Sequence, residues 1–191
     1  MSFFPATRRR VRIAAAMLAL GLVTFLAVGR MRYQGIVVAG SSMEPTLHNG
    51  DFLLLDRGAY RTQPPRRDDL VIVWRHGERI VKRVVGLPGE TVEVRRGVLY
   101  VDGRRLPSSH PEQPGFLEIL RGHLVGDRYA VLGDNRSMTA EETVHAVVGP
   151  QDIAGRVVAW FSWRTGRIGA FGETPADKSP TAAAADPRSS G

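Results

Sequence analysis

The sequence predicts a mostly β domain, an antiparallel sheet or barrel-like assembly, that follows a single N-terminal transmembrane helix. Three observations support this fold class. Residues 13–29 carry no charge and follow a basic head. Between residues 35 and 163, short β-branched and apolar runs alternate with Gly, Pro and Asp-Gly turns. No long 3.6-residue apolar period occurs in that region, which favours strands over helices.

The N-terminal segment has the charge pattern of a membrane anchor. Residues 1–12 contain four arginines, residues 13–29 are uncharged, and two further arginines follow directly. This bias favours a cytoplasmic head at 1–12 and export of the chain after it. The 17 residues of the segment are near the lower limit for crossing a bilayer, which takes about 20. A cleaved secretory signal, suggested by the small-x-small triplet at 27–29, and a buried core helix are the alternatives.

The remaining chain divides into a β-rich domain at 30–165 and a tail. Residues 107–123 are rich in Pro, Ser, Gly and His and are expected to form an inserted loop. Residues 166–191 are expected to form a disordered tail, because they become rich in Ala, Pro, Asp and Ser. Strands are expected at Phe52–Leu55, Leu70–Trp74, Ile80–Val85, Val92–Val94, Val98–Val101, Tyr129–Leu132 and Ile153–Trp160.

Composition excludes several kinds of chemistry. The chain contains no cysteine, so disulfides, thiolate nucleophiles and thiolate metal sites are excluded. The formal net charge is +7, but arginines cluster beside the uncharged segment, which is typical of contact with anionic membrane lipid. We therefore expect membrane lipid as a partner and no nucleic acid. Of the 26 basic residues only two are lysines, Lys82 and Lys178, so the β-rich domain holds one lysine.

Lys82 is a candidate general base. In its predicted strand the side chain shares a face with Ile80 and Val84, since successive side chains alternate. If that face is buried, the loss of water lowers the pKa of the ammonium, and a neutral lysine can accept a proton. Arginine cannot replace it, because arginine stays protonated in proteins. The alternative is a lysine whose charged end reaches solvent from an edge strand.

A serine or threonine is the natural nucleophile in a chain without cysteine. The segment GSSMEPTLHNGD, residues 40–51, places two serines between a glycine and a proline. Such a turn can present a hydroxyl beside backbone N–H groups that would hold an oxyanion. An ordinary polar β-turn is the alternative. A later Gly-Asp-Asn turn contains Asp134, which can brace a loop or pair with Arg136.

Histidine-based and metal-based catalysis are both disfavoured. None of the five histidines lies in a G-x-S-x-G context or in an H-E-x-x-H spacing. His145, which follows the pair Glu141-Glu142, is the best placed for a serine-histidine-acid triad, but the rest of that pattern is missing. We expect no metal and no cofactor.

Three segments, taken in order, resemble sequence boxes of one enzyme family. Residues 42–47 (SMEPTL) resemble the serine box of bacterial type I signal peptidases. Residues 82–90 (KRVVGLPGE) are similar to their lysine box, and residues 133–136 (GDNR) to their late box. Residues 49–51 and 152–156 also fit. The resemblance covers roughly residues 10–163 and implies a mostly β catalytic domain whose substrates are signal-peptide-bearing preproteins.

The resemblance also implies the roles of particular residues. Ser42 is the expected nucleophile and Lys82 the general base of a Ser-Lys dyad. Val38, Met43 and Val81 are the expected substrate-binding residues, at shallow pockets for positions −1 and −3 of the signal peptide. The expected enzyme is a membrane-bound serine endopeptidase of the bacterial cytoplasmic (inner) membrane. It would be single-pass, with its N-terminus inside and its catalytic domain on the outer face.

The late part of the family pattern differs in this chain. The family run Ser-x-Asp-Ser-Arg is replaced at residues 139–143 by Thr-Ala-Glu-Glu-Thr, which keeps a hydroxyl and an acid but loses the arginine. An alternative function is therefore a catalytically impaired or specialised paralogue that binds or matures a narrow set of export or conjugation substrates. The residues expected to support the oxyanion or the dyad are Gly40, Ser41, Asp134, Thr139 and Glu141.

Overall fold

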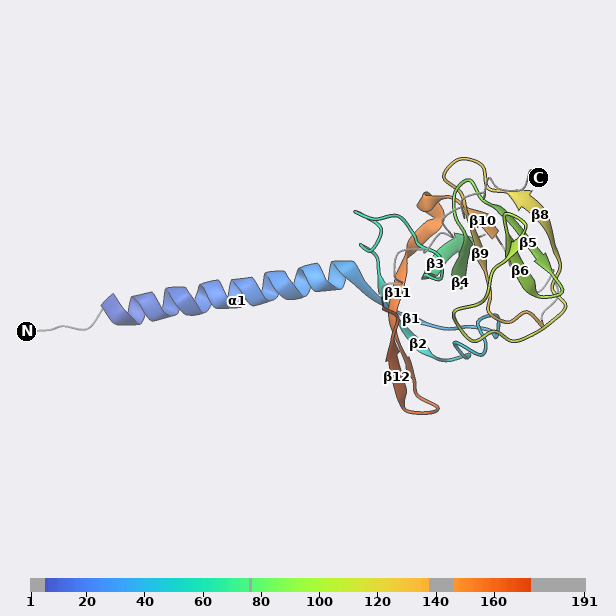
Figure 1. Cartoon of the computed structure of the whole chain (residues 1–191). Helices are drawn as coiled ribbons and strands as arrows, with labels where there is room; N and C mark the ends of the chain where they lie inside the picture. Colours follow the sequence, from blue (N-terminus) through green and yellow to red (C-terminus); the bar gives the residue numbers. More distant parts are fainter. Residues whose placement is uncertain (1–5, 76, 138–145, 173–191) are drawn as a thin grey trace, which may run out of the picture.

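The computed structural model describes residues 6–75, 77–137 and 146–172, and it shows one long helix followed by two antiparallel β-sheets (Figure 1). The helix α1 spans Ala6–Arg32 and the 3-10 helix η1 spans Pro150–Asp152. The first sheet contains β1 (Tyr33–Val37), β2 (Phe52–Asp56), β3 (Leu70–Arg75), β4 (Glu78–Gly86), β9 (Tyr129–Leu132), β10 (Ala146–Val148), β11 (Ile153–Ser162) and β12 (Arg167–Ala170). The second sheet contains β5 (Thr91–Arg95), β6 (Val98–Val101), β7 (Arg104–Arg105) and β8 (Ile119–His123).

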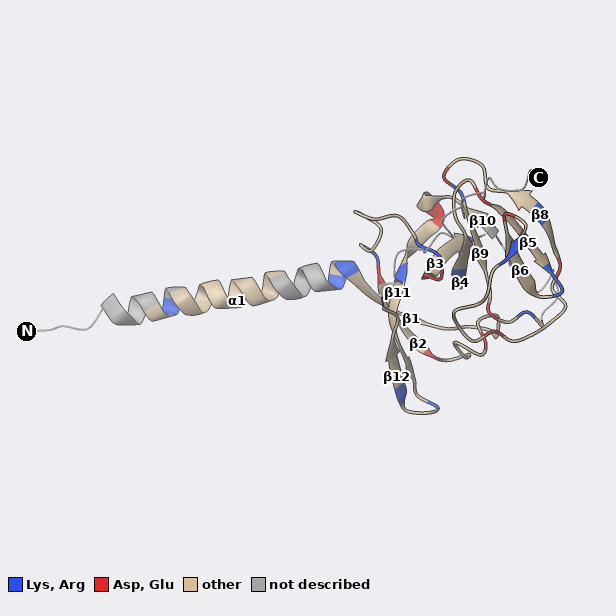
Figure 2. Ribbon diagram, in the orientation of Figure 1, with Lys and Arg blue, Asp and Glu red and all other residues tan. Residues whose placement is uncertain are grey.

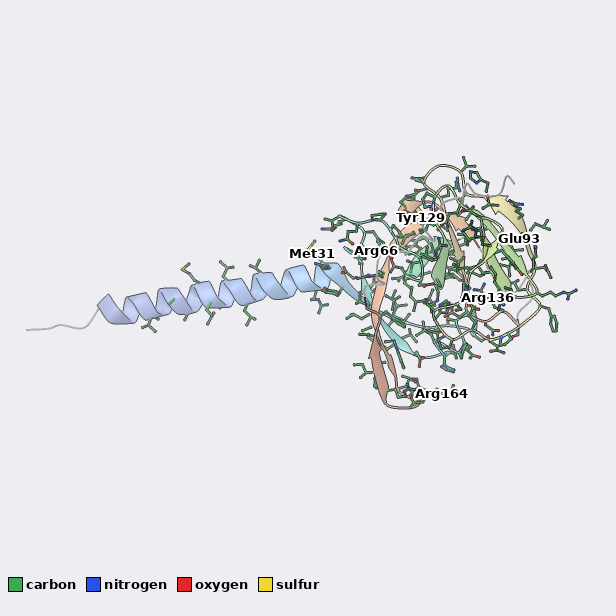
Figure 3. All side chains as sticks on the ribbon, in the orientation of Figure 1. Met31, Arg66, Glu93, Tyr129, Arg136 and Arg164 are labelled. Atoms are coloured by element: carbon green, nitrogen blue, oxygen red, sulfur yellow. The ribbon has the colours of Figure 1, made fainter. Side chains whose placement is uncertain are left out.

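Helix α1 extends away from the two sheets as a single rod (Figure 1). Its described apolar side chains are largely exposed; Leu18, for example, is 77% exposed. Figure 3 shows these side chains projecting along the helix, whereas those of the sheets crowd together. The sequence of the helix carries no charge between Arg12 and Arg30. In Figure 2 the coloured part of this stretch is tan. Within the residues described, no helix reaches the length and hydropathy required of a membrane span, so the anchor at 13–29 stays a prediction.

The end of α1 is tied to the first sheet by a two-point ion pair. Nε of Arg32 lies 3.0 Å from Oδ1 of Asp56, and Nη2 lies 2.8 Å from Oδ2. The backbone N–H of Arg57 also donates to the carbonyl of Arg32 at 2.9 Å. Strand β1 continues directly from the helix and pairs along its whole length with β2. The direction in which α1 leaves the sheet is therefore set by the sheet itself.

The order of the first sheet brings two distant segments together. Among the described residues the strands run β1-β2-β11-β3-β4-β9-β10, with β12 added on β11. Strand β4 lies between β3 and β9, so that Lys82 is opposite Val71 and Arg83 is opposite Leu132. Because β9 ends at Leu132, the turn that follows it (residues 133–136) emerges beside Lys82. The lysine box and the late box predicted from sequence thus become neighbours.

Two clusters of buried apolar side chains support the loop between β1 and β2 and join the two sheets. One lies under the loop between β1 and β2 and contains Met43, Leu47, Leu53 and Ile72, each no more than 1% exposed. The other joins the two sheets and includes Val85, Val92, Val94, Leu99 and Leu117. Complete burial of an aliphatic side chain of this size contributes about 1.5–3 kcal/mol relative to exposure. The loop that carries the two serines is therefore anchored by the core.

The mostly β, antiparallel fold class is confirmed, and all seven expected strands are present. The sequence pattern does not predict β1, β7, β8, β10 or β12. Strand β8 corrects the last part of the loop expected at 107–123, and β12 corrects the first part of the tail expected at 166–191, of which residues 173–191 lie outside the described residues. Strands β8 and β12 are short, largely exposed and contain glycine and arginine, so pairing with β5 and β11 holds them rather than their own composition.

Candidate active site

The loop between β1 and β2 (residues 38–51, the serine loop) holds two serines in a fixed place. Two backbone hydrogen bonds, each 2.9 Å long, close its ends. Within it, Met43 and Leu47 are 1% and 0% exposed and pack into the core. The side chains of Met43 and Leu47 thus hold this side of the loop against the core, while Ser41 and Ser42 stay half-buried at the surface.

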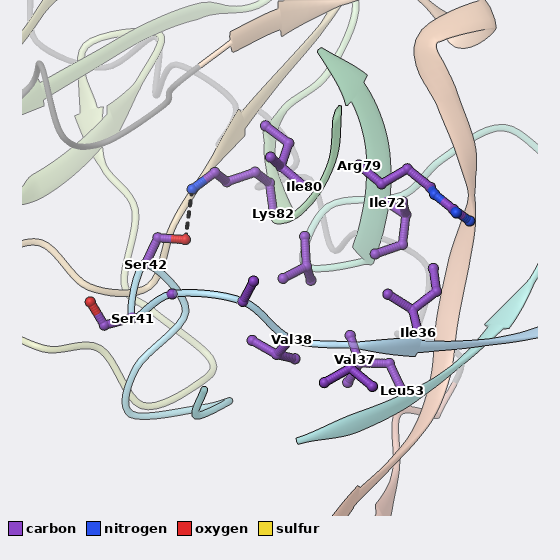
Figure 4. Close-up of a pocket in the computed structure, with 13 residues that line it drawn as sticks. Ile36, Val37, Val38, Ser41, Ser42, Leu53, Ile72, Arg79, Ile80 and Lys82 are labelled. Atoms are coloured by element: carbon purple, nitrogen blue, oxygen red, sulfur yellow. Dashed lines mark hydrogen bonds between the residues drawn. The ribbon is translucent and has the colours of Figure 1, made fainter. Parts of the chain in front are cut away.

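Ser42 and Lys82 meet at the end of this loop. Nζ of Lys82 lies 2.9 Å from Oγ of Ser42, within hydrogen-bond distance (Figure 4). The side chain of Ser41 points away from the lysine in the same view. Lys82 is 2% exposed, so its amine is almost completely removed from water. The structure thus places a hydroxyl beside a buried amine, which is the geometry that proton transfer between them requires.

Gly133 explains how the two groups can approach so closely. A methyl group at this position would lie 2.3 Å from the carbonyl oxygen of Ser42 and 3.4 Å from Nζ of Lys82. The first distance is far shorter than any real contact between such atoms. The backbone of the turn after β9 therefore packs directly against Ser42 and Lys82, and only glycine fits there.

Burial sets the protonation of Lys82. The loss of water around its amine lowers the pKa of Lys82 to about 8, while the nearby Asp134 carboxylate opposes this and Arg136 assists it. An exposed lysine would stay charged until well above this pH. Near pH 8, a large share of Lys82 is consequently neutral and able to accept a proton from Ser42.

The backbone around Ser42 is held by the late turn. The amide of Asn135 donates to the carbonyl of Ser42 at 3.1 Å, and its side chain Nδ2 donates to the carbonyl of Ser41 at 3.2 Å. Gly40, whose φ is +91°, donates its N–H to Oδ1 of Asn49 at 3.1 Å. Within the part of the chain that the structure describes, the N–H of Ser42 has no hydrogen-bond acceptor. That N–H is available to an oxyanion.

Asp134 connects the serine loop to β4. Its carboxylate is 0% exposed and accepts hydrogen bonds from Arg83 at 2.9 and 2.6 Å and from Oγ1 of Thr46 at 2.6 Å. His110 contacts the same carboxylate at 3.2 Å. Burial by itself raises the pKa of Asp134, but the contacts with Arg83 and His110 outweigh it and hold that pKa well below its usual range. Asp134 is therefore a permanent buried anion.

A cleft of about 240 Å³ leads to Ser42 and Lys82. One wall is formed by residues 36–42 and the other by residues 79–82, and Leu53 and Ile72 also line it (Figure 4). Most of these side chains are aliphatic. Strand β1, at one wall, pairs with β2 on one side and has no strand partner on the other among the described residues. The cleft can therefore admit an extended peptide with small apolar side chains.

The structure brings most of the predicted site residues together. Val38 and Val81 line opposite walls of the cleft, and Gly40 and Ser41 line the same wall as Val38. Met43 corrects a prediction, because its side chain turns into the core and does not line the cleft. Three other residues of the sequence analysis, Thr139, Glu141 and His145, lie outside the described residues.

Sequence reasoning missed several residues of this neighbourhood. Ile36, Ile72 and Arg79 line the cleft, and Thr46 and His110 contact Asp134. The alternation of the 79–82 strand could have suggested Arg79, since it shares a face with Val81. No local signal indicates His110, which lies in an irregular loop. Among the described residues, no group of His, Asp and Glu side chains could hold a metal ion.

The fold and the site define a β-rich protein with a serine and a buried lysine at the end of an apolar cleft. Residues 9–163 match the family model described as signal peptidase, peptidase S26. Signal peptidase I of Leptolyngbya laminosa is 33% identical over 171 residues, covering 84% of this chain and 81% of that protein. Signal peptidase I of Bacillus caldolyticus is 31% identical over 141 residues, covering 65% of this chain and 77% of that protein.

A solved structure of a signal peptidase I from Enterococcus faecalis V583 is 30% identical and aligns with a TM-score of 0.38, over 49% of this chain and 97% of that chain. The family match covers most of the present sequence. The chain therefore belongs to the signal peptidase family, peptidase S26, and is an enzyme of its serine endopeptidase class. Type I signal peptidases are associated with membranes in bacteria.

Proposed function

We propose that this chain removes signal peptides from exported preproteins, with Ser42 as nucleophile and Lys82 as general base. The observation that carries the proposal is the 2.9 Å contact between Oγ of Ser42 and Nζ of Lys82, combined with 2% exposure of the lysine. A lysine with a pKa of about 8 can serve as a base, whereas an exposed lysine is charged at the same pH. Family membership supports the same reaction.

The reaction follows from the geometry around Ser42. Neutral Lys82 takes the hydroxyl proton as Oγ attacks the scissile carbonyl carbon, and the N–H of Ser42 stabilises the oxyanion that forms. The tetrahedral intermediate breaks its C–N bond, and Lys82 gives its proton to the leaving amine. Lys82 is then neutral again and deprotonates the water that hydrolyses the acyl ester of Ser42.

The cleft supports recognition of small residues near the cut. Val38 and Val81 narrow it from opposite walls, beside Ser42. We assign them to the pockets for positions −1 and −3, which would take alanine-sized side chains. The open side of β1 offers backbone groups to an extended signal peptide, so affinity would come from main-chain pairing and selectivity from the small pockets.

We further propose that residues 13–29 anchor the chain in the cytoplasmic membrane. The supporting observations are exposed apolar side chains along α1, the absence of charge in that stretch of sequence, and arginines at both ends. In this arrangement residues 1–12 lie inside and the domain from residue 30 lies on the outer face. Anionic lipid would then be a partner of the flanking arginines.

A second candidate function is a specialised relative with narrow substrates. It is favoured by the sequence at 139–143, where Thr143 stands in place of the arginine of the family pattern. Such an enzyme would keep the chemistry of Ser42 and Lys82 but would cut few preproteins. A panel of preproteins distinguishes it from a general signal peptidase.

The proposal is tested by incubating the detergent-purified full chain with a preprotein that carries an Ala-x-Ala site. We expect cleavage after that site by the wild type and none by Ser42→Ala. Thr165→Ala, which removes an exposed hydroxyl in the turn between β11 and β12, is the matched control and should cleave like the wild type. Cleavage by Ser42→Ala at the wild-type rate would rule out this nucleophile.

A further inference from the structure

His110 is a buried histidine that the proposed reaction does not use. It lies in the loop between β7 and β8, and its side chain is 12% exposed. Nε2 lies 3.2 Å from Oδ1 of Asp134 and 3.5 Å from Oε1 of Glu112, while Nδ1 lies 3.8 Å from Oδ1 of Asp68. Neither ring nitrogen is aligned for a hydrogen bond, so these are close ion-pair contacts. One imidazole thus faces three carboxylates from three parts of the chain.

Three carboxylates and two arginines surround the His110 ring. Arg83 of β4 donates two hydrogen bonds to Asp134, and Nη2 of Arg136 donates to Glu112 at 2.9 Å. These two arginines face three carboxylates; the third, Asp68, is 25% exposed and accepts a hydrogen bond from Ser109. When Lys82 is neutral the cluster therefore has a net negative charge around the fully buried Asp134, and an imidazolium at His110 offsets it.

The balance of effects on the His110 ring agrees with this count. Burial lowers the pKa of His110, but the contacts with Asp134 and Glu112 outweigh it, so the pKa is raised above the ordinary 6.5. Arg83 acts against protonation through its own positive charge. The charged ring therefore stabilises the cluster fully below pH 6.5, and this contribution is lost as the pH rises through the raised pKa.

Asp134 links His110 to the dyad. Its carboxylate attracts the ammonium of Lys82 and raises the pKa of that lysine, against the effect of burial. A positive charge placed on Asp134 weakens this attraction. Arg83 supplies one such charge, and His110 supplies a second at Oδ1. The two cations therefore favour the neutral form of Lys82.

We propose that His110 is a positioning residue for this enzyme: its imidazolium neutralises the buried Asp134 carboxylate and thereby keeps Lys82 available as a neutral base. This inference rests on the proposed function of Ser42 and Lys82. His110 does not line the cleft and reaches Lys82 through its contact with Asp134. It also links the loop between β7 and β8 to catalysis, although that loop lies outside the three sequence boxes.

The test is the pH profile of kcat/KM for preprotein cleavage by the full chain in detergent. His110→Gln removes the charge but keeps a polar side chain. We expect it to lose about three- to tenfold in kcat/KM at pH 6, where the wild-type ring carries its charge, since a tenfold change corresponds to one pKa unit on the acid limb. At pH 10, where Lys82 is neutral in both proteins, it should match the wild type. His110→Lys, which restores a positive charge, should keep the wild-type kcat/KM at pH 6.

The matched control is His123→Gln, which changes an exposed histidine of β8 in the same way and should leave the profile unchanged. A loss in His110→Gln that is equal at every pH, or an equal loss in His110→Lys, would mean a purely structural contact and overturn the proposal. An unchanged profile in His110→Gln would overturn it as well.

Two further measurements separate this inference from the proposed function and from a folding defect. The NMR titration of His110 in the wild-type chain should have its midpoint above pH 6.5, and a midpoint at or below 6.5 would overturn the inference without any variant. Ser42→Ala in the same cleavage assay reports on the dyad alone. Cleavage by Ser42→Ala would overturn the proposed function, while the His110 midpoint is read independently.

Discussion

Arg83 donates two hydrogen bonds to the carboxylate of Asp134, from Nε at 2.9 Å and from Nη2 at 2.6 Å, and both side chains are at most 5% exposed. Arg83 follows Lys82 on β4, and Asp134 follows Gly133 after β9. The ion pair therefore joins the two segments that position the amine and the backbone of the dyad. Its loss should affect both stability and catalysis.

Asp134→Asn should destabilise the chain by about 3–5 kcal/mol, because it leaves the Arg83 guanidinium buried without its anion. The measurement is thermal or denaturant unfolding in detergent at pH 7. Glu93→Gln is the control, since it makes the same carboxylate-to-amide change in the exposed Arg95–Glu93 ion pair and should leave the unfolding midpoint unchanged. Equal midpoints for the two variants would contradict a structural role of Asp134.

Gly133→Ala should nearly abolish cleavage. The added methyl group would lie 2.3 Å from the carbonyl oxygen of Ser42, so the serine loop must move. A displacement of about 1 Å can cost on the order of a hundredfold in rate, and we expect at least that loss in kcat/KM. Gly172→Ala is the matched control, because a methyl group there meets nothing within 4 Å. A Gly133→Ala enzyme with wild-type kinetics would show that Ser42 is not held by the turn after β9.

The acid limb of the pH profile should reflect Lys82. Lys82 must be neutral to accept the proton of Ser42, so kcat/KM should rise with pH and level off above about 8, the pKa that burial gives this lysine. The measurement is kcat/KM for a preprotein between pH 5 and 10.5. A limb near pH 10.5 would indicate an exposed lysine, and a profile that is flat across the range would exclude a titrating base.

Lys82→Met should be more stable than the wild type at neutral pH. Folding must bury the lysine ammonium below pH 8, which is unfavourable, and it releases a proton between pH 8 and the ordinary lysine value of 10.5. Wild-type stability therefore rises with pH across that window. The advantage of Lys82→Met, on the order of 1–3 kcal/mol below pH 8, should fade between pH 8 and 10.5 and vanish above pH 10.5. Lys178→Met should show no such pH-dependent difference from the wild type.

Much of the fold follows from local pattern, and the exceptions have physical reasons. The strand expected at Ile80–Val85 forms most of β4, and its alternation puts Lys82 on the same face as Ile80 and Val84. The sequence alone leaves open whether that face is buried, and the structure shows Lys82 to be 2% exposed. Strands β8 and β12 were not predictable, because their pairing with β5 and β11 holds them. The amino-acid composition of these two segments is that of a loop and of a tail, not that of a strand.

The site could be predicted only in part. Sequence motifs indicated Ser42, Lys82 and Asp134, but Met43 was assigned to the cleft although its side chain turns inward at the loop anchor. The partners of Asp134 were not predictable. Thr46 and Arg83 lie 88 and 51 residues away from it in the chain, and only the fold makes such contacts.

The central claim is that Lys82 is the base for Ser42, and the most direct test is preprotein cleavage by Lys82→Arg at pH 8 to 9. Arginine keeps the positive charge but cannot be neutral at this pH, so we expect turnover to fall below detection while the unfolding transition stays cooperative. Lys178→Arg, the same change at the other lysine of the chain, should cleave at the wild-type rate. Wild-type cleavage by Lys82→Arg would contradict the account.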